Sequence, residues 1–500
     1  MTLYPCLAPR PSFRLAFALG LFLIASGATT RLRAQTPVTS GTYTVRADKP
    51  QQIIRGLGFE IQSDSIGSGN QGMPSEVVAV PHDLTPSEKT RFYTQMLHGF
   101  RYSRLALGLY LRGLDAEQKH IIERYPGQMN DLHTMQEVSG IEGFDVEYWS
   151  PAPYWKANKS YYGGTIASTT PEFVSAFSDA MVQDLRYLDA HGLRVVQWGL
   201  QNEPGVGLQA KSAVAHASGS AAQAYATCSY SPEDYFTVLR ATAPKVRALL
   251  PDVQIQAPSW DGPSGKYAAE IRKDPALTKN IDSWTWHQIG HDSNDSIDLR
   301  AKYLDGADGK PVYENEFEYQ PWAKNLTVDQ YFMNTGQSLM NWMVFENSPV
   351  WYWLHALKPV TNMEATGYAL GFWRPAGAIN NTLRPNLQVG HWDFNPYIWN
   401  ALAGFLKYLP WDATRLQVDE STVQYDQRIL VWRKLGKLGI ALSNRGTHPY
   451  TFVLTGITAK ELQGHRYTVS SLDDPLGTKR GESQISITVP PQSYEFWISR

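Results

Sequence analysis

Two short acidic motifs in this chain carry side chains that could do acid–base chemistry. The first, residues 198–204, reads WGLQNEP and places Asn202 and Glu203 directly before Pro204. Proline cannot continue a strand ladder, so this motif presents an amide and a carboxyl group at the point where a β-strand ends. A plain polar turn is the alternative interpretation of the same residues.

The second motif, residues 310–319, reads KPVYENEFEY and is predicted to form another β-strand. Because side chains alternate along a strand, Glu314, Glu316 and Glu318 are expected to share one face. Three carboxylates on one face are costly to bury unless they are paired or functional. If that face points outward, it is a solvated acidic stripe instead.

Glycoside hydrolysis requires a pair of carboxyl groups that meet across a cleft. One carboxylic acid protonates the departing oxygen, and the other carboxylate attacks the sugar or activates water. Retaining enzymes hold the two groups about 5–5.5 Å apart, whereas inverting enzymes hold them about 6.5–9.5 Å apart. The sequence does not measure this gap, so the residues alone leave both mechanisms open.

The chain from about residue 53 to 410 alternates between short β-rich runs and amphipathic helices. Clear helix starts occur at residues 85–88, 170–172 and 231–234, where a hydroxyl residue precedes a proline and an acid. The alternation predicts an α/β fold, a (β/α)8 TIM barrel, with an open doubly wound sheet as the alternative. The two acidic motifs then lie on the fourth and seventh strands, whose C-terminal ends share the barrel mouth. The eight expected strands are residues 53–60, 101–108, 144–149, 194–200, 253–258, 281–287, 311–317 and 350–354.

The end of the chain has a different pattern. Residues 414–500 hold short alternating runs separated by Gly, Asn, Asp and Pro, which predicts antiparallel strands in a side β-sandwich. Residues 41–47 (GTYTVRA) alternate in the same way and are expected to pair with that sandwich. The predicted organisation is therefore a signal peptide (1–34), an N-terminal strand joining the sandwich (35–55), a catalytic barrel (56–410) and a β-sandwich (411–500).

Composition limits the class of protein further. The 500 residues are 43% hydrophobic with a formal net charge of −2, which gives no electrostatic case for a nucleic-acid partner. Arg10 and Arg14 precede a short apolar run, residues 15–28, so a signal peptide cleaved after Ala34 is expected. An uncleaved anchor is the alternative. The protein is expected to be secreted or periplasmic, without stable membrane insertion.

Cysteine usage argues against disulfide or metal chemistry. Removal of residues 1–34 leaves Cys228 as the single cysteine, which cannot close an intrachain disulfide. The sequence has no Cys/His cluster at zinc-ligand spacing and no phosphate-binding glycine motif. We therefore expect neither a metal nor another cofactor, and we expect Cys228 to be a bystander.

Additional motifs resemble glycoside hydrolase family 30, a family in the clan of retaining β-glycosidases with (β/α)8 barrels. Residues 100–108 (FRYSRLALG) resemble its second strand, residues 149–156 (WSPAPYWK) its third-strand signature, and residues 395–397 and 404–408 the run into its side sandwich. The resemblance covers nearly all of the mature chain. It implies a retaining mechanism with Glu203 as acid/base and Glu316 as nucleophile, Glu314 and Glu318 being the rivals for the second role. It also implies that Asn202 holds the sugar 2-hydroxyl and that Arg104 lies near the nucleophile.

Further residues are predicted to contact substrate. His287 resembles a histidine near the sugar, and Trp353 resembles a tryptophan that forms the floor of the first sugar subsite, with Trp351 as its competitor. The family places a tyrosine two positions after the histidine, where this chain has Ile289, so either another group orients Glu316 or the site differs from that of the family. The expected substrate-binding residues, besides Asn202 and Arg104, are Glu60, Trp149, His287 and Trp353.

Taken together, these features predict a retaining β-glycoside hydrolase that acts on a carbohydrate by double displacement. Residues 358–376 do not resemble the loop with which glucuronoxylanases of the family bind glucuronate, although Arg374 could meet an anion. A β-glucan or β-glucoside is therefore favoured over xylan. The alternatives are a non-catalytic carbohydrate-binding protein on a barrel scaffold and a barrel enzyme of another class, which would call for a metal or phosphate site.

Overall fold

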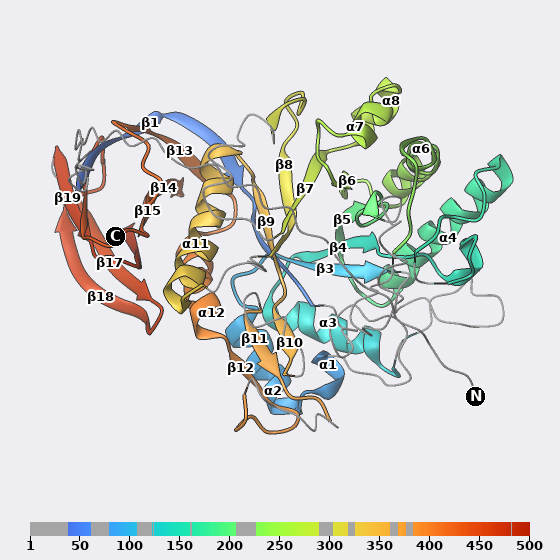
Figure 1. Ribbon diagram of the computed structural model, residues 1–500, viewed down its shortest axis with the longest axis horizontal. Coiled ribbons are helices and arrows are strands. Elements are labelled where there is room, and N and C mark those ends of the chain that lie inside the picture. The colour runs from blue at the N-terminus through green and yellow to red at the C-terminus, as the bar shows by residue number, and fades with distance from the viewer. Residues whose placement is uncertain are drawn as a thin grey trace, which may run out of the picture. The chain divides into compact units, whose positions relative to one another are not determined.

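The computed structural model describes residues 39–61, 80–107, 123, 125–160, 163–206, 227–289, 304–318, 326–360, 369–376, 384–481 and 483–500. Eight strands form a closed barrel in which each pairs with the next, and the last returns to the first in parallel register (Figure 1). This closure confirms the predicted barrel and excludes an open sheet. The barrel strands are β2 (Gly56–Glu60), β3 (Tyr102–Leu107), β4 (Gly143–Tyr148), β5 (Val195–Gly199), β6 (Gln254–Trp260), β7 (Ser283–Ile289), β8 (Val312–Glu318) and β9 (Val350–Leu354).

The helices begin where the sequence predicts them. The hydroxyl of Thr170 accepts the N–H of Phe173 at 3.4 Å, and the hydroxyl of Ser231 accepts the N–H of Asp234 at 3.1 Å, each beside a proline in the first turn. Thr85 precedes a helix in the same way but makes no side-chain cap bond. The described helices are α1 (Val80–Asp83), α2 (Pro86–Arg91) with a π turn (Phe92–Met96), α3 (Gln128–Ser139), a 3-10 turn (Pro153–Trp155), α4 (Pro171–Ala190), α6 (Pro232–Leu249), α7 (Lys266–Ile271), α8 (Pro275–Asn280), α11 (Val328–Phe345) and α12 (Pro396–Tyr408).

A nine-stranded sheet follows the barrel, in the order β18-β17-β20-β15-β14-β13-β1-β16-β19. Its first strand in the chain, β1 (Ser40–Ile54), pairs antiparallel with β13 and parallel with β16. The other strands are β13 (Ala413–Glu420), β14 (Gln427–Lys434), β15 (Lys437–Asn444), β16 (Tyr450–Thr455), β17 (Glu461–Thr468), β18 (Ser471–Arg480), β19 (Gln484–Val489) and β20 (Ser493–Ser499). Three short strands, β10 (Leu357–Pro359), β11 (Gly371–Trp373) and β12 (Trp392–Phe394), form a separate small sheet.

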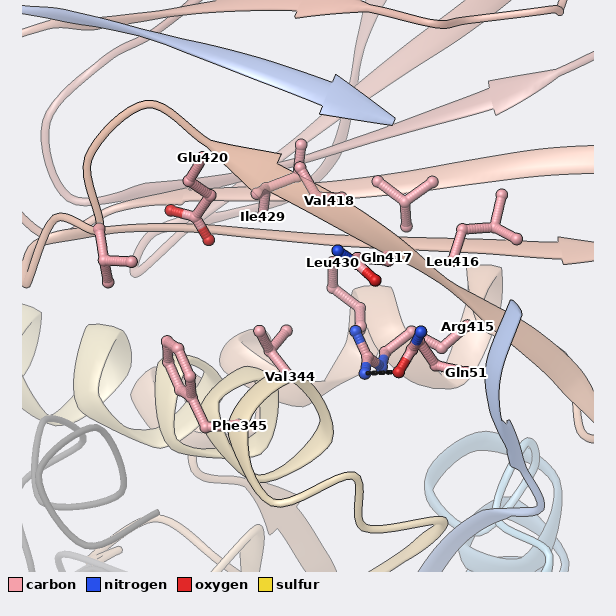
Figure 2. A pocket seen from close by; sticks show the side chains of 12 residues that line it. Gln51, Val344, Phe345, Arg415, Leu416, Gln417, Val418, Glu420, Ile429 and Leu430 are labelled. Carbon is pink, nitrogen blue, oxygen red and sulfur yellow. Dashed lines mark hydrogen bonds between the residues drawn. The ribbon is translucent and has the colours of Figure 1, made fainter. Parts of the chain in front are cut away.

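A cavity of about 290 Å³ lies where β13 and β14 separate. The antiparallel strands pair only from residues 414–416 to residues 431–433, so Gln417, Val418 and Glu420 of β13 and Ile429 and Leu430 of β14 line the gap. Figure 2 shows side chains of α11, including Phe345, below the strands, with Glu420 and Arg415 lying apart in the same view. All lining residues come from β1, α11, β13, β14 and the turn after β13, so this cavity is separate from the barrel mouth.

The barrel interior is divided into an aromatic part and a polar part. Tyr102, Tyr313 and Tyr352 form a buried cluster with Val350, and the Tyr352 ring occupies space that any side chain at Gly58 would fill, since a Cβ there would lie 2.2 Å from it. Nearer the C-terminal ends of the strands the inward side chains are polar and charged. That second part contains the candidate site.

Candidate active site

Glu203 lies just past the C-terminal end of β5, as the WGLQNEP motif predicts. Its N–H donates to the carbonyl oxygen of Ser259 on β6 at 2.9 Å, and the N–H of Asn202 donates to the carbonyl oxygen of Tyr148 on β4 at 2.8 Å. Glu203 has a φ of 45°, a left-handed conformation that non-glycine residues rarely adopt. Such a conformation persists only where the surrounding contacts hold it in place, and residues of this kind cluster at functional sites.

Glu316 lies on β8 at an irregularity in the strand. Trp286 of β7 pairs with Glu314 and His287 pairs with Glu316, so β8 has one extra residue over this step. Glu316 therefore shares the inward face with His287, whereas Glu314 follows Trp286 to the other face. The prediction that Glu314, Glu316 and Glu318 share a face is wrong for Glu314. The side chain of Glu318 is outside the described residues.

The carboxyl groups of Glu203 and Glu316 meet at His287. Nδ1 of His287 lies 3.1 Å from Oε1 of Glu203 and 3.6 Å from Oε2 of Glu316. One oxygen of each carboxylate lies within 4.8 Å of the other, and the two glutamates are only 7% and 6% exposed. The structure thus brings together two of the predicted acids and the predicted histidine at one end of the barrel.

Arg104 is the main cation beside this pair and is completely buried. Its Nη1 contacts Glu316 and lies 3.1 Å from Oε2 of Glu60, and its Nη2 donates to Oδ1 of Asn202 at 2.7 Å. The guanidinium carbon lies 4.4 Å from the ring centroid of Trp149. Burial by itself would lower the pKa of Arg104, but nearby carboxylates, with Glu316 among them, hold that pKa well above its usual value.

Glu60 and Trp149, two of the predicted substrate contacts, therefore lie in the same cluster as the acids. Glu60 ends β2 and is also 3.9 Å from Nδ1 of His355, a buried histidine after β9. Burial lowers the pKa of His355 well below its usual value, so His355 is neutral and gives Glu60 no countercharge. Glu60 and Trp149 are 1% and 2% exposed, so in this structure they shape the base of the site rather than its open surface.

Trp353 does not lie at the site. Tyr352 donates its hydroxyl to Oε1 of Gln197 at 3.2 Å inside the barrel, so by alternation Trp351 and Trp353 face outward. The Trp353 ring is completely buried, with its centroid 5.7 Å from that of Trp351 and 5.9 Å from that of Phe317. The prediction that Trp353 forms the floor of a sugar subsite is therefore wrong, and its competitor Trp351 is excluded for the same reason.

Two partly exposed tryptophans, Trp260 and Trp286, lie on the strands that carry Ser259 and His287 and were not predicted. Trp260 ends β6 and Trp286 precedes His287 on β7, and the two are paired across these neighbouring strands. A Cβ on Gly205 would lie 2.8 Å from the Trp260 ring, which places that ring against the residue two positions after Glu203. Both tryptophans occur at the ends of predicted strands, which is the signal that could have identified them.

A second acidic pair, Asp145 and Glu147 on β4, was also missed. Both side chains are completely buried, and both accept hydrogen bonds from Nε2 of Gln256, at 2.7 and 3.3 Å. Burial, followed by the charge of Glu147, raises the pKa of Asp145 to about 7, against the opposing effect of Arg104. Two acids at alternate positions of a strand expected to be buried were a usable sign of this second pair.

Glu203, His287 and Glu316 also have the donor types of a site for a divalent cation. One candidate ligand atom from each lies within 4.8 Å of the other two, and histidine with carboxylates suits zinc and related metals. The positively charged guanidinium of Arg104 already contacts Glu316, and its charge disfavours a second cation beside that carboxylate. The same three groups are sufficient for acid–base chemistry on their own.

Comparison with known proteins addresses the fold. No family model and no curated protein sequence matches the chain. Among solved structures, xylanase C of glycoside hydrolase family 30 from Talaromyces cellulolyticus superposes with a TM-score of 0.66 at 14% identity, over 92% of this chain and 100% of that one. The chain has the family 30 fold. The resemblance predicted from the sequence is thereby confirmed at the level of the fold.

Two further structures resemble the chain over a similar extent. A conserved exported protein from Bacteroides fragilis gives a TM-score of 0.69 at 10% identity, over 91% of this chain and 100% of that one. An endo-β1,6-glucanase gives 0.63 at 12% identity, over 92% and 94%. At these identities the comparison establishes architecture, and residue roles have to be argued from the site.

Several predictions fall on residues outside the described part of the chain. These are the signal peptide at residues 1–34, the side chain of Ile289 and most of the loop between Gly205 and Ser229. Among the described residues, no helix combines the length and apolar character needed to cross a membrane.

Proposed function

We propose that this protein is a retaining β-glycoside hydrolase, with Glu203 as acid/base and Glu316 as nucleophile. The observation that carries the proposal is the spacing of the two carboxylates, which have oxygens within 4.8 Å of each other. A nearest oxygen–oxygen separation of this size favours the roughly 5–5.5 Å between the carboxyl groups of retaining enzymes over the roughly 6.5–9.5 Å that leaves room for water in inverting ones. The family 30 fold supports the same assignment.

In this mechanism Glu316 attacks the anomeric carbon while Glu203 gives its proton to the departing oxygen. Glu203 then takes a proton from water, which attacks the glycosyl–enzyme ester and releases Glu316. Arg104 forms an ion pair with Glu316 and so orients it, which is the role that the family gives to a tyrosine at the position of Ile289. Asn202, fixed by Arg104 at 2.7 Å, is assigned to the sugar 2-hydroxyl.

For the substrate, we propose a β-linked glucan or glucoside rather than xylan. The solved structures that resemble the chain include xylanases and an endo-β1,6-glucanase, so the fold accommodates both kinds of glycan. The preference rests on the absence, in the sequence of residues 358–376, of a glucuronate-binding pattern. With Trp353 excluded, Trp260, which lies against Gly205, is the aromatic surface that we assign to sugar stacking.

The same proposal covers export and domain organisation. We infer that residues 1–34 direct the protein out of the cytoplasm, that residues 56–410 are the catalytic barrel, and that residues 35–55 and 411–500 form the side domain. A non-catalytic carbohydrate-binding protein is the second candidate. The buried Arg104 contact to Glu316 argues against it, because binding alone does not require an ionised carboxylate opposite a second acid.

The test is hydrolysis of a panel of aryl β-glycosides by the wild type, Glu203→Gln and Glu316→Gln. Glu495→Gln is the matched control, since Glu495 is also buried but lies on β20 of the nine-stranded sheet, where it pairs with Arg466. We expect each catalytic variant to lose roughly 10²–10⁴-fold in kcat/KM or more, and the control to stay active. A wild type without activity on any glycoside, or catalytic variants as fast as the wild type, would overturn the proposal.

A further inference from the structure

Glu147 is a fully buried carboxylate of β4 whose two oxygens are both occupied. Oε2 accepts from Nε of Arg104 at 3.1 Å, from Nη2 of Arg104 at 2.5 Å and from Nδ2 of Asn315 at 3.3 Å. Oε1 accepts from Nε2 of Gln256 at 3.3 Å and from the hydroxyl of Ser259. One side chain therefore connects strands β3, β4, β6 and β8 inside the barrel.

The double contact with Arg104 fixes the direction of the third guanidinium nitrogen. A guanidinium is planar and rigid, so the bonds from Nε and Nη2 to the single oxygen Oε2 fix which edge of the group faces Glu147. Nη1 is then directed at the opposite side, where it meets Glu316 and lies 3.1 Å from Oε2 of Glu60. The ion pair on Glu316 thus depends on a contact made on the far side of Arg104.

The other partners of Glu147 lead to the same pair of acids. Asn315 is the residue before Glu316, at the point where β8 carries its extra residue. Ser259, whose hydroxyl contacts Glu147, accepts the N–H of Glu203 through its carbonyl oxygen at 2.9 Å. Glu147 is therefore linked to the backbone of each acid through one intervening residue, Ser259 for Glu203 and Asn315 for Glu316.

We propose that Glu147 is a positioning residue that aims Arg104 at Glu316 and so holds the nucleophile in line for attack. The proposal rests on the retaining mechanism given above and assigns a residue that acts through Arg104 without touching the sugar. Glu60 provides the comparison, because it also pairs with Arg104 but only through Nη1. Removing the charge of Glu60 leaves the two-point contact of Glu147 with Arg104 in place.

The experiment compares Glu147→Gln with Glu60→Gln, both of nearly unchanged size, in crystal structures and in steady-state kinetics on the aryl β-glycoside that the wild type hydrolyses best. We expect Arg104 to turn away from Glu316 in Glu147→Gln, with kcat at least tenfold lower and KM within twofold of the wild type. In Glu60→Gln we expect Arg104 to keep its contact with Glu316. If Glu147→Gln does not fold, Glu147→Asp replaces it, because aspartate keeps the negative charge but holds it one methylene farther from Arg104. The same movement of Arg104 and the same loss in kcat are expected.

An Arg104 that keeps its place in the Glu147 variant, or a kcat that does not change, would overturn the positioning role. A loss confined to KM would do the same, because it would indicate ground-state binding. The crystal structures decide the orientation of Arg104 even for a protein without glycosidase activity. An inactive wild type would therefore overturn the proposed function, whereas an unmoved Arg104 would overturn this inference alone.

Discussion

Nδ1 of His287 lies 3.1 Å from Oε1 of Glu203, close enough for a hydrogen bond between the two side chains. The same nitrogen is 3.6 Å from Glu316, so the histidine lies between the proposed acid and the proposed nucleophile. Its side chain is only 2% exposed. His287 can therefore fix the rotamer of Glu203 without competition from bulk water.

His287→Ala should reduce kcat/KM on an aryl β-glycoside by roughly 10–100-fold, because a hydrogen bond to a charged group is worth about 1.5–3 kcal/mol. His82→Ala serves as the control, since His82 pairs with Asp83 and its side chain is 47% exposed. We expect the control to hydrolyse at the wild-type rate. Equal activity of His287→Ala and the wild type would show that the contact with Glu203 has no catalytic role.

Arg104→Met should destabilise the fold by about 3–5 kcal/mol, because the change leaves buried carboxylates without their cation. Chemical unfolding at neutral pH measures the difference. Lys245→Met removes a surface pair with Asp179, in which the side chains are 35% and 57% exposed, and should cost no more than about 1 kcal/mol. Comparable losses in the two variants would contradict the central place of Arg104 among the acids.

Asp145 should make the fold less stable as the pH rises. Its pKa is raised to about 7 in the folded chain, so the native state binds a proton that the unfolded chain releases near pH 4. The stabilisation is complete below about pH 4 and is lost as the pH increases through about 7. Between pH 5 and pH 8 the unfolding temperature of the wild type should fall by a few degrees more than that of Asp145→Asn. Parallel curves for the two proteins would exclude an Asp145 with a raised pKa.

Trp353→Leu should affect stability and leave substrate binding unchanged. The ring is completely buried on the outer face of β9, so its loss should cost about 2–4 kcal/mol, slightly less than truncation to alanine, with KM within twofold of the wild type. Trp260→Leu is the counterpart beside Glu203 and should raise KM instead. A higher KM for Trp353→Leu would return that residue to the substrate site.

The elements of the barrel could be predicted because short β-rich runs alternate with amphipathic helices along the chain. Pro204 marked the end of one strand, and thereby the position of Glu203. The face of Glu314 could not be predicted, because one extra residue in β8 reverses the alternation and leaves no mark in the composition. Sequence periodicity assumes a regular strand, and the irregularity occurs at the functional residue itself.

The prediction for Trp353 failed for a different physical reason from the prediction for Glu314. Both faces of a barrel strand are buried, one by the interior and one by the helices, so a strand such as β9 (VWYWL) can be apolar on both faces. The run of Trp351, Tyr352 and Trp353 offers no polar position that would show which residues face inward. The structure shows which residues face inward, through the contact of Tyr352 with Gln197 and the Tyr352 ring packed over Gly58.

The most direct test of the proposed pair is to trap the glycosyl–enzyme with a 2-deoxy-2-fluoro-β-glycoside that carries a good leaving group. Mass spectrometry of a proteolytic digest then locates the label. A single label on Glu316, absent from Glu316→Gln, is the predicted result. A label on another residue, or the release of product with inverted anomeric configuration from a wild type that forms no adduct, would contradict the mechanism.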